Sequence, residues 1–512
     1  MERFLMRHGD RIAGILSGFD RLLFRGTLRS IAYVKGLDIF LSSHRVLYKD
    51  FGTFAAGVSE QLKAHAEALA AKERRPFRYI TSARISKEEV AREILRTDPI
   101  TDGLICVLSC VEPCHSFTIR RDRATRHLQL SSQERKCLHL YFYFLDRHFG
   151  VMHVRLQTWL PCTLQVCVNG REWLARQMTQ GGLGYVQADN AFVHLEDPER
   201  AQLLADRLLD WPWGPFLQRL ARRINPWACA ARTDLKPYYW SLRQGEYATD
   251  VIFRDAPTLA CWYPRLLHHA IEHFGADDVL RFLGRRLTGH FTGDLCTDLQ
   301  RRREGTRIKH WIDENSIKMY DKAGRLLRIE TTLNNPRRFR VRRAIRRHGT
   351  RVCTWLPLRK SIADLRRWVE IARAANARYL NALSVVGEAT PSHHLLDPVS
   401  QRVTRHGRPF RALQPITPNE TAVFQVLLHG QFCIQGIRNA DLRHQLFPEA
   451  EHTVVPRRQA SGRISRLLRL LRAHGLLRKV SGTRYYRVTT KGHAVMTTAL
   501  TFRQTDVALL AA

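Results

Sequence analysis

The chain has 512 residues, too many for one ordinary domain, and at roughly 150 residues per domain it predicts about three. Its 82 Lys and Arg residues against 47 Asp and Glu residues give a formal net charge of +35, too basic for a typical metabolic enzyme. Hydrophobic residues make up 44% and aromatic residues 9%, which excludes a disordered basic tail protein. We therefore expect an anionic polymer as partner, nucleic acid first, with an acidic protein or a membrane surface as alternatives.

Neither a membrane span nor a secretion signal is predicted. No stretch approaches the roughly 18 to 20 uncharged apolar residues of a span, and charges interrupt residues 1–16 before a signal core can form. The 11 Cys residues, an odd number in a long chain, indicate reduced thiols. These features predict a cytoplasmic protein without a membrane partner.

Residues 1–130 predict an N-terminal α/β domain, because apolar runs of strand length alternate there with patterns of helical period. The predicted strands are 19–24, 77–80 and 104–111, and the predicted helices are 31–42, 54–71 and 87–95. The continuous apolar run at 104–111 is typical of a buried strand.

A central basic domain is predicted from 131 to 390, and it begins with an antiparallel meander. Segments rich in aromatic and branched residues at 137–146, 150–160 and 163–170 indicate three strands. Because side chains alternate along a strand, one face is expected to carry Leu140, Phe142 and Phe144 toward a core. The other face is aromatic and cationic, and its residues expected to reach nucleic acid are Tyr141, Tyr143 and Arg155.

Several weaker patterns predict no site. Residues 171–300 carry no catalytic signature, and the motif GxxxxGK(S/T) of ATP-binding loops is missing, so no cofactor is predicted. Six thiols and imidazoles suggest zinc, but their spacing does not fit the usual knuckles, and buried reduced Cys is the favoured interpretation. These six residues are Cys106, Cys110, Cys114, His115, Cys137 and His139.

The most basic part of the chain, 301–350, holds 16 Lys or Arg residues and 5 acids. Within it, residues 316–332 (SIKMYDKAGRLLRIETT) predict a β-hairpin whose three-residue loop, Lys322 to Gly324, pairs Met319 with Leu327. A two-residue loop is the less favoured alternative. The favoured register, with a preceding strand RIKHWI, places cations and aromatic rings on one face. They are Lys309, Trp311, Lys318, Tyr320, Arg328 and Glu330.

Three roles compete for this hairpin. As a platform, Trp311 and Tyr320 stack on unpaired bases while the cations hold phosphates. As a purely structural hairpin, it needs only a cross-strand pair of Lys318 with Glu330. Its Tyr-Asp-Lys and Arg-x-Glu segments also resemble the replication initiators of rolling-circle plasmids and filamentous phages. That resemblance implies Tyr320 as a nucleophile and Glu330 as a ligand of a divalent metal; against it, Asp321 and Glu330 should point to opposite faces.

Residues 391–415 lack a convincing period and predict a linker. The next segment, 416–502, predicts a winged helix-turn-helix domain. Its expected elements are helices at 419–428, 439–446, 461–474 and 491–500, an extended piece at 432–436, and strands at 477–480 and 484–488.

The helix predicted at 461–474 indicates the function of this domain. At 100° per residue, Ile464, Leu467, Leu468 and Leu471 share one side, and Leu470 is the exception. Four Arg residues occupy the opposite half, and further cations lie on the two strands, as insertion into a major groove requires. The alternative is a solvated basic face without a ligand. The residues predicted to contact nucleic acid are Arg463, Arg466, Arg469, Arg472, Arg478, Lys479, Arg484 and Arg487.

The segment ISRLLRLLRAHGLLRKVSGTRYYRVTTKGHAV at 464–495 resembles the winged-helix domains of MarR-type regulators. This resemblance implies DNA binding more than it implies repression. The whole chain also resembles a family of bacterial proteins that carry segments such as YFYFLD, LGRRLTG, IKMYDK and RIETT, which implies no activity.

Together these observations predict an α+β (mixed α/β) protein, with N-terminal and central α/β domains containing antiparallel sheets and a C-terminal winged helix-turn-helix. The expected function is nucleic-acid binding, with DNA favoured over RNA, in a bacterial mobile genetic element as the initiator resemblance implies. One alternative is a metal-dependent, strand-transferring nuclease that uses Tyr320. Another is a ligand-responsive transcriptional regulator, which predicts a closed apolar pocket and a two-fold dimer interface.

Overall fold

The structure, a computed structural model, divides the chain into two compact units. The main unit comprises residues 1–271, 281–285 and 292–384, and the C-terminal unit comprises 272–280, 286–291 and 385–512. Helices and strands both make up large parts of the chain, so the predicted α+β class is confirmed. The structure describes residues 1–82, 84–230, 233–284, 295–302, 305–347, 350–386, 392–405, 407–429, 432, 436–451, 454–480 and 482–505.

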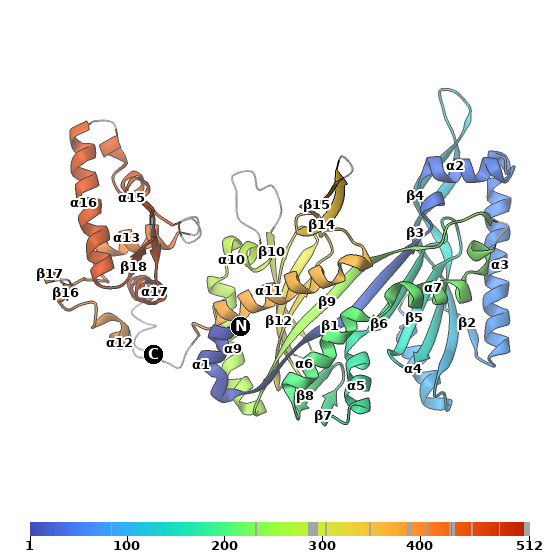
Figure 1. Cartoon of the computed structure of the whole chain (residues 1–512), viewed down its shortest axis with the longest axis horizontal. Coiled ribbons are helices and arrows are strands. Elements are labelled where there is room, and N and C mark those ends of the chain that lie inside the picture. The colour runs from blue at the N-terminus through green and yellow to red at the C-terminus, as the bar shows by residue number, and fades with distance from the viewer. Residues whose placement is uncertain are drawn as a thin grey trace. The chain divides into compact units, whose positions relative to one another are not determined.

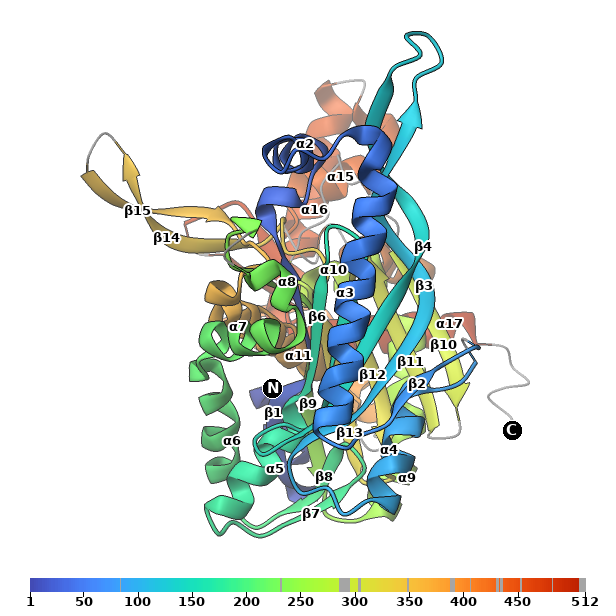
Figure 2. The same cartoon turned by 90° about the vertical axis from the view of Figure 1, so that its right-hand side faces the viewer.

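One large β-sheet forms the centre of the main unit (Figures 1 and 2). The described residues contribute eleven strands, and neighbouring strands are antiparallel except for the short edge pair β2–β3. In order across the sheet, the strands are β10 (Leu295–Arg302), β11 (Gly305–Ile312), β12 (Asn315–Lys322), β13 (Leu326–Thr332), β9 (Tyr239–Phe253), β1 (Ile12–Thr27), β6 (Leu164–Asn169), β5 (Gly150–Gln157), β4 (Leu128–Asp146), β3 (Gly103–Arg121) and β2 (Phe77–Tyr79).

The sheet is continuous across the domain boundary predicted at residue 130. Strand β1 lies between β6 and β9, and the predicted boundary falls inside β4. Residues 1–130 therefore form no compact unit of their own, which corrects the predicted division. Sequence patterns indicate where strands lie but not which strands pair, because pairing depends on contacts between distant parts of the chain.

The first face of this sheet carries the main hydrophobic core. Leu140, Phe142 and Phe144 are buried there, as predicted, and β4 packs against α3 (Phe51–Lys72). Helices α7 (Trp213–Ile224) and α11 (Leu365–Leu383) cover other parts of the same face. The remaining helices before residue 385 are α1 (Glu2–His8), α2 (Val34–Ser43), α4 (Lys87–Thr97), α5 (Gly170–Gln180), α6 (Pro198–Asp206), α8 (Pro226–Cys229), α9 (Ala256–His273) and α10 (Ala276–Phe282).

Two hairpins of the main unit lie outside the large sheet. One is β7 (Tyr185–Ala188) with β8 (Ala191–Leu195), and the other is β14 (Arg340–Arg347) with β15 (Thr350–Pro357). Of the segment LGRRLTG, residues 285–289 lie outside the described part of the chain. In the part of the chain that the structure describes, no helix combines the length and the apolar character that a membrane span requires.

In the C-terminal unit, helices and strands follow one another in the predicted order (Figure 1). Of the expected extended piece, residues 433–435 lie outside the described part of the chain, and Ile437 pairs with Tyr486 beside the hairpin. The elements are α13 (Pro418–Leu428), α15 (Asn439–Leu446), α16 (Val454–Ala473), β18 (Leu477–Lys479), β19 (Tyr486–Val488) and α17 (Thr490–Gln504).

The predicted linker at 391–415 belongs to the C-terminal unit. It contains α12 (Ser392–Leu396) and the hairpin β16 (Val403–Arg405) with β17 (Arg408–Phe410). Val399 and Leu413 are buried in the core of this unit, so the linker prediction is wrong. The apolar residues of this segment are interrupted by Pro, Gly and charged residues and keep no helical or strand period, which explains the error.

Candidate nucleic-acid interface

Helix α16 is apolar on one side and cationic on the other. Ile464, Leu468 and Leu471 are buried in the core of the C-terminal unit, and Leu467 is partly buried, as the period predicted. Leu470, the expected exception, is also buried. The four predicted arginines of this helix are all exposed: Arg463, Arg466, Arg469 and Arg472.

The positive charge of α16 is not balanced within the helix. Its 20 residues include six Arg and no Asp or Glu. Arginines three residues apart are neighbours on a helix surface, where like charges destabilise the helix. The helix is held on α15, since the Asn439 side-chain amide donates hydrogen bonds to the Ser461 carbonyl oxygen and the Ser465 hydroxyl, each at 2.9 Å.

The hairpin after α16 adds a second surplus of positive charge. Arg478 and Arg487 occupy directly opposite positions on β18 and β19, and both are exposed, as are Lys479 and Arg484. Like charges at opposite positions of an antiparallel pair are destabilising. An anion bound between the two guanidinium groups would remove that penalty.

The predicted central hairpin is formed by β12 and β13, but with a different register. Met319 pairs with Ile329 instead of Leu327, because the loop is Ala323 to Arg325, with both Ala323 and Gly324 at positive φ. The shift is two residues, so each side chain stays on its predicted face. A one-residue shift would have reversed the faces.

Two of the predicted site residues on this hairpin, Tyr320 and Glu330, hydrogen-bond to each other. The Tyr320 hydroxyl donates to Glu330 Oε2 at 2.9 Å, and Lys318 Nζ donates to Glu330 Oε1 at 2.6 Å. Burial would raise the pKa of Glu330, but Lys318 and Arg328 outweigh it and lower the pKa. Burial and then Glu330 raise the pKa of Tyr320 well above its ordinary value, so the phenol remains protonated.

Arg328 is buried completely in a charged cluster, so the prediction that it contacts nucleic acid is wrong. Its Nε and Nη2 donate to the two carboxylate oxygens of Asp250 at 2.6 and 2.8 Å, and Arg171 of α5 lies 3.0 Å from the same carboxylate. Arg328 also donates to the carbonyl oxygen of Asn190, in the β7–β8 turn, at 2.9 Å. Burial opposes ionisation of Asp250, but Arg171 and Arg328 lower its pKa.

The catalytic interpretation finds little support in this geometry. Arg328 and Glu330 are 0% and 2% exposed, and both oxygens of Glu330 already accept hydrogen bonds. A partly buried phenol that stays protonated is a poor nucleophile. Among the described residues, no three Asp, Glu, His or Cys side chains gather closely enough to hold a metal ion.

The other predicted platform residues, Lys309, Trp311 and Lys318, line a groove of about 310 Å³ on the second face of the sheet. Lys309 pairs with Lys318 across β11 and β12, and its ammonium lies 5.1 Å from the centre of the Trp311 ring. Burial and then Lys318 lower the pKa of Lys309. Cations and one partly exposed ring therefore remain accessible here.

The aromatic face of β4 is less open than predicted. Tyr143 is buried in a small core beneath α4, so it offers no free ring for stacking, which corrects that prediction. Tyr141 and Arg155 both contact Glu112, at 2.8 and 2.9 Å. Burial would raise the pKa of Glu112, but its hydrogen bonds with Lys87 and Tyr141 and the charge of Arg155 lower the pKa to about 2. This cluster is satisfied internally.

The thiols and imidazoles considered for zinc lie along β3 and β4. Cys106, Cys110 and Cys137 are buried, which agrees with the interpretation as reduced core thiols. Burial lowers the pKa of His139 to about 4, so it is neutral. The exposed His115 is 2.7 Å from the Ser132 hydroxyl.

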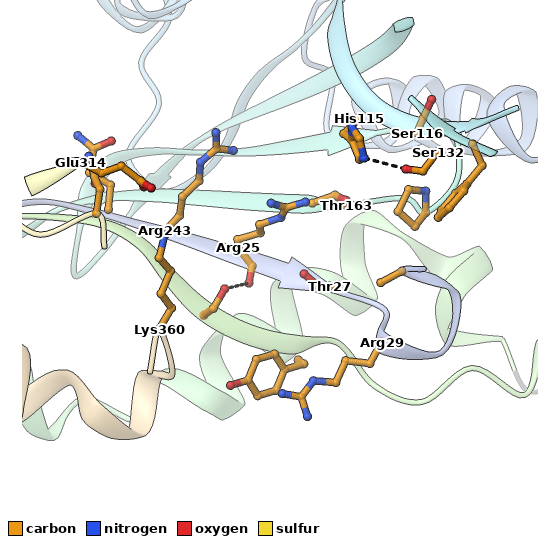
Figure 3. Close-up of a pocket in the computed structure, with 17 residues that line it drawn as sticks. Arg25, Thr27, Arg29, His115, Ser116, Ser132, Thr163, Arg243, Glu314 and Lys360 are labelled. Atoms are coloured by element: carbon orange, nitrogen blue, oxygen red, sulfur yellow. Dashed lines mark hydrogen bonds between the residues drawn. The ribbon is translucent and has the colours of Figure 1, made fainter. Parts of the chain in front are cut away.

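A larger hollow was not predicted from the sequence: a cleft of about 770 Å³ on the second face of the sheet (Figure 3). Its cations come from distant segments: Arg25 lies near the end of β1, Arg29 follows that strand, Arg243 lies on β9 and Lys360 follows β15. Glu314 is the single carboxylate among the described residues that line it. The cleft and the Trp311 groove share part of their lining and form one continuous surface.

A β-bulge shapes this cleft. Leu23 pairs with Gln244 whereas Phe24 pairs with Leu242, so Arg243 is an extra residue in β9. Because of the bulge, Arg243 and Gln244 both line the cleft although they are consecutive. No alternation in the sequence indicates this arrangement.

The cations of the cleft repel one another. Burial and then Arg243 lower the pKa of Arg25. Burial also lowers the pKa of Lys360. The Glu314 carboxylate opposes this shift, and the repulsion of Arg243 adds to it. The Arg29 guanidinium stacks on the Tyr239 ring at 3.4 Å from its centre, which holds it at the rim. A ligand with several anionic oxygens would relieve this repulsion.

Comparison with known proteins adds no identification, because no family model, no curated protein and no solved structure matches the chain.

Proposed function

We propose that this protein binds duplex DNA, with its C-terminal unit acting as a winged helix-turn-helix whose helix α16 enters the major groove. The observation that carries the proposal is the exposed, acid-free row of four arginines on α16, opposite its buried face. Guanidinium groups recognise guanine edges and phosphates bidentately, and a helix fits the width of the B-DNA major groove. The cations of the β18–β19 hairpin then contact the flanking backbone.

The main unit is proposed to hold the nucleic-acid backbone in its cationic cleft. Four cations with one carboxylate among the described lining residues suit a chain of phosphates. In the adjoining groove, Trp311 can stack on an unpaired base beside Lys309 and Lys318. DNA is favoured over RNA because the major groove of an A-form helix is too deep and narrow for α16. The association with a mobile genetic element and the cytoplasmic location remain predictions.

The salt dependence of binding tests the role of α16. We would measure fluorescence anisotropy of a random-sequence DNA duplex with the full chain between about 50 and 200 mM salt. The double variant Arg466→Gln, Arg469→Gln should bind the duplex with an affinity lower by on the order of tenfold or more. It should also reduce the slope of log K against log salt by about 2, since each lost phosphate contact contributes roughly 0.9.

A matched variant controls for the change of net charge. Arg402 and Arg503 are exposed in the same unit, outside α16 and its hairpin, and their double change to Gln should preserve affinity and slope. Equal affinities and slopes for both double variants would overturn groove docking by α16. So would a wild-type chain that shows no salt-dependent binding to duplex DNA.

A further inference from the structure

The hairpin β14–β15 projects from the main unit as a two-stranded ribbon (Figure 2). Its strands pair with each other and not with the eleven-stranded sheet. A two-stranded ribbon is marginally stable alone in water, so an exposed one needs support from its base or from a ligand.

The base of this ribbon is fixed to the main unit. Arg343 forms an ion pair with the buried Asp364 just before α11. Arg367 of α11 donates to the Arg340 carbonyl oxygen at 2.9 Å, and its guanidinium carbon lies 5.8 Å from the centre of the Trp355 ring. The ribbon therefore has a supported root.

Beyond the root, the ribbon is an exposed cationic surface. One of its faces carries Arg342 and Arg346 on β14 and Arg351 and Trp355 on β15, all exposed. Arg346 and Arg351 stand directly opposite each other, an arrangement that like charges disfavour. The sequence of β14 and β15 contains no Asp or Glu. Nothing on the ribbon itself neutralises these guanidinium groups.

The chain leads from the ribbon directly into the cleft. Strand β15 ends at Pro357, and Lys360 lines the cleft three residues later. On the opposite side, His115 and Ser132 of the β3–β4 hairpin line the same cleft. A polymer lying in the cleft would therefore pass the root of the ribbon.

We propose that the β14–β15 ribbon enters the major groove of a DNA duplex whose backbone lies in this cleft. The inference rests on the proposed function and adds a second groove contact to that of α16. A two-stranded ribbon fits the major groove of B-DNA, and arginines are the side chains that most often read guanine there. Single-strand binding is disfavoured, because stacking on successive bases needs several rings and the described strands of this ribbon carry one, Trp355.

Protection of guanine N7 from methylation by dimethyl sulfate tests the proposal, because N7 lies in the major groove. The probe is a duplex selected from a random-sequence pool by the wild-type chain. The variant combines Arg342→Gln, Arg346→Gln and Arg351→Gln, three exposed side chains whose loss leaves the root intact. We expect one set of guanines to lose protection, and the salt slope to fall by at most about 3, the value if all three arginines also contact phosphates.

Three exposed helical arginines provide the matched control: Arg96→Gln, Arg219→Gln and Arg222→Gln should preserve the wild-type footprint and slope. A ribbon variant with the wild-type footprint would overturn the proposal, and so would a lower slope without any lost N7 protection, since that means backbone contact alone. The Arg466→Gln, Arg469→Gln variant should lose a different set of guanines. If it loses none while the ribbon variant does, the α16 proposal fails and the ribbon proposal stands.

Discussion

Two charged regions share the second face of the main sheet, and β9 runs through both. At one end of β9, Asp250 lies beneath α5 and the β7–β8 turn, where Arg171 and Arg328 converge on its carboxylate. At the other end, Arg243 lines an open cleft together with Arg25. In the covered region the cations lie against a carboxylate, whereas the open region carries an excess of positive charge.

The difference follows from the cost of removing charges from water. In the covered region, an unpaired ion would cost several kcal/mol, so each buried guanidinium lies against a carboxylate. In the open cleft, water screens the surplus, and the cost appears as lowered pKa values of Arg25 and Lys360, caused by burial and then by the repulsion of Arg243. A fold tolerates such a surplus at modest cost, and a phosphate polymer can use it. The covered region is therefore expected to stabilise the fold, and the open region is the one proposed to bind nucleic acid.

The largest effect is expected from the covered region. Asp250→Asn removes the carboxylate shared by Arg171 and Arg328, whose side chains are 1% and 0% exposed, and leaves two buried cations poorly paired. We expect the free energy of unfolding to fall by about 3 to 5 kcal/mol, measured by urea denaturation.

An exposed ion pair provides the control for Asp250→Asn. Glu88 and Arg92 pair at 2.8 Å on α4, with side chains 58% and 55% exposed. Glu88→Gln should cost no more than about 0.5 kcal/mol. If Asp250→Asn proved equally mild, the covered cluster would not be the stabilising half of this comparison.

The open region should respond in the opposite sense. Arg25→Gln combined with Arg243→Gln removes two mutually repelling cations, so the free energy of unfolding should stay unchanged or rise slightly. Affinity for duplex DNA should fall by roughly tenfold at low salt, and the salt slope should fall by about 2. Anisotropy titrations and urea denaturation of one preparation measure both quantities. Arg219→Gln with Arg222→Gln makes the same change in net charge on α7 and should leave the affinity intact.

The sequence identified the arginine row of α16 and the shared face of the central hairpin, because both depend on local period alone. A helix of known phase places Arg463, Arg466 and Arg469 opposite its core whatever lies around it. In the hairpin, even a two-residue error in register left Lys318 and Glu330 on one face. Because side chains alternate between the two faces of a strand, a register error of two residues leaves each side chain on its predicted face.

The cleft was not predicted, because distant parts of the chain form it. Arg25, Arg243 and Lys360 meet because β1 is inserted between β6 and β9 and because a bulge turns Arg243 toward the cleft. Long-range pairing and a bulge leave no local period in the sequence. The burial of Tyr143 was missed for a related reason, since α4 packs over a face whose residue pattern is that of an exposed one.

The smallest expected effect comes from Tyr320, which lies where the covered and open regions meet. Tyr320→Phe removes one hydrogen bond to Glu330, whose other oxygen still accepts from Lys318 at 2.6 Å. The free energy of unfolding should fall by about 1 kcal/mol, and duplex affinity should not change. Because burial and Glu330 keep the phenol protonated, we expect no covalent protein–DNA adduct with either form. A denaturing gel of the protein with labelled single-stranded DNA and a divalent metal checks this. An adduct that forms with the wild-type chain and not with Tyr320→Phe would show that Tyr320 is a catalytic residue.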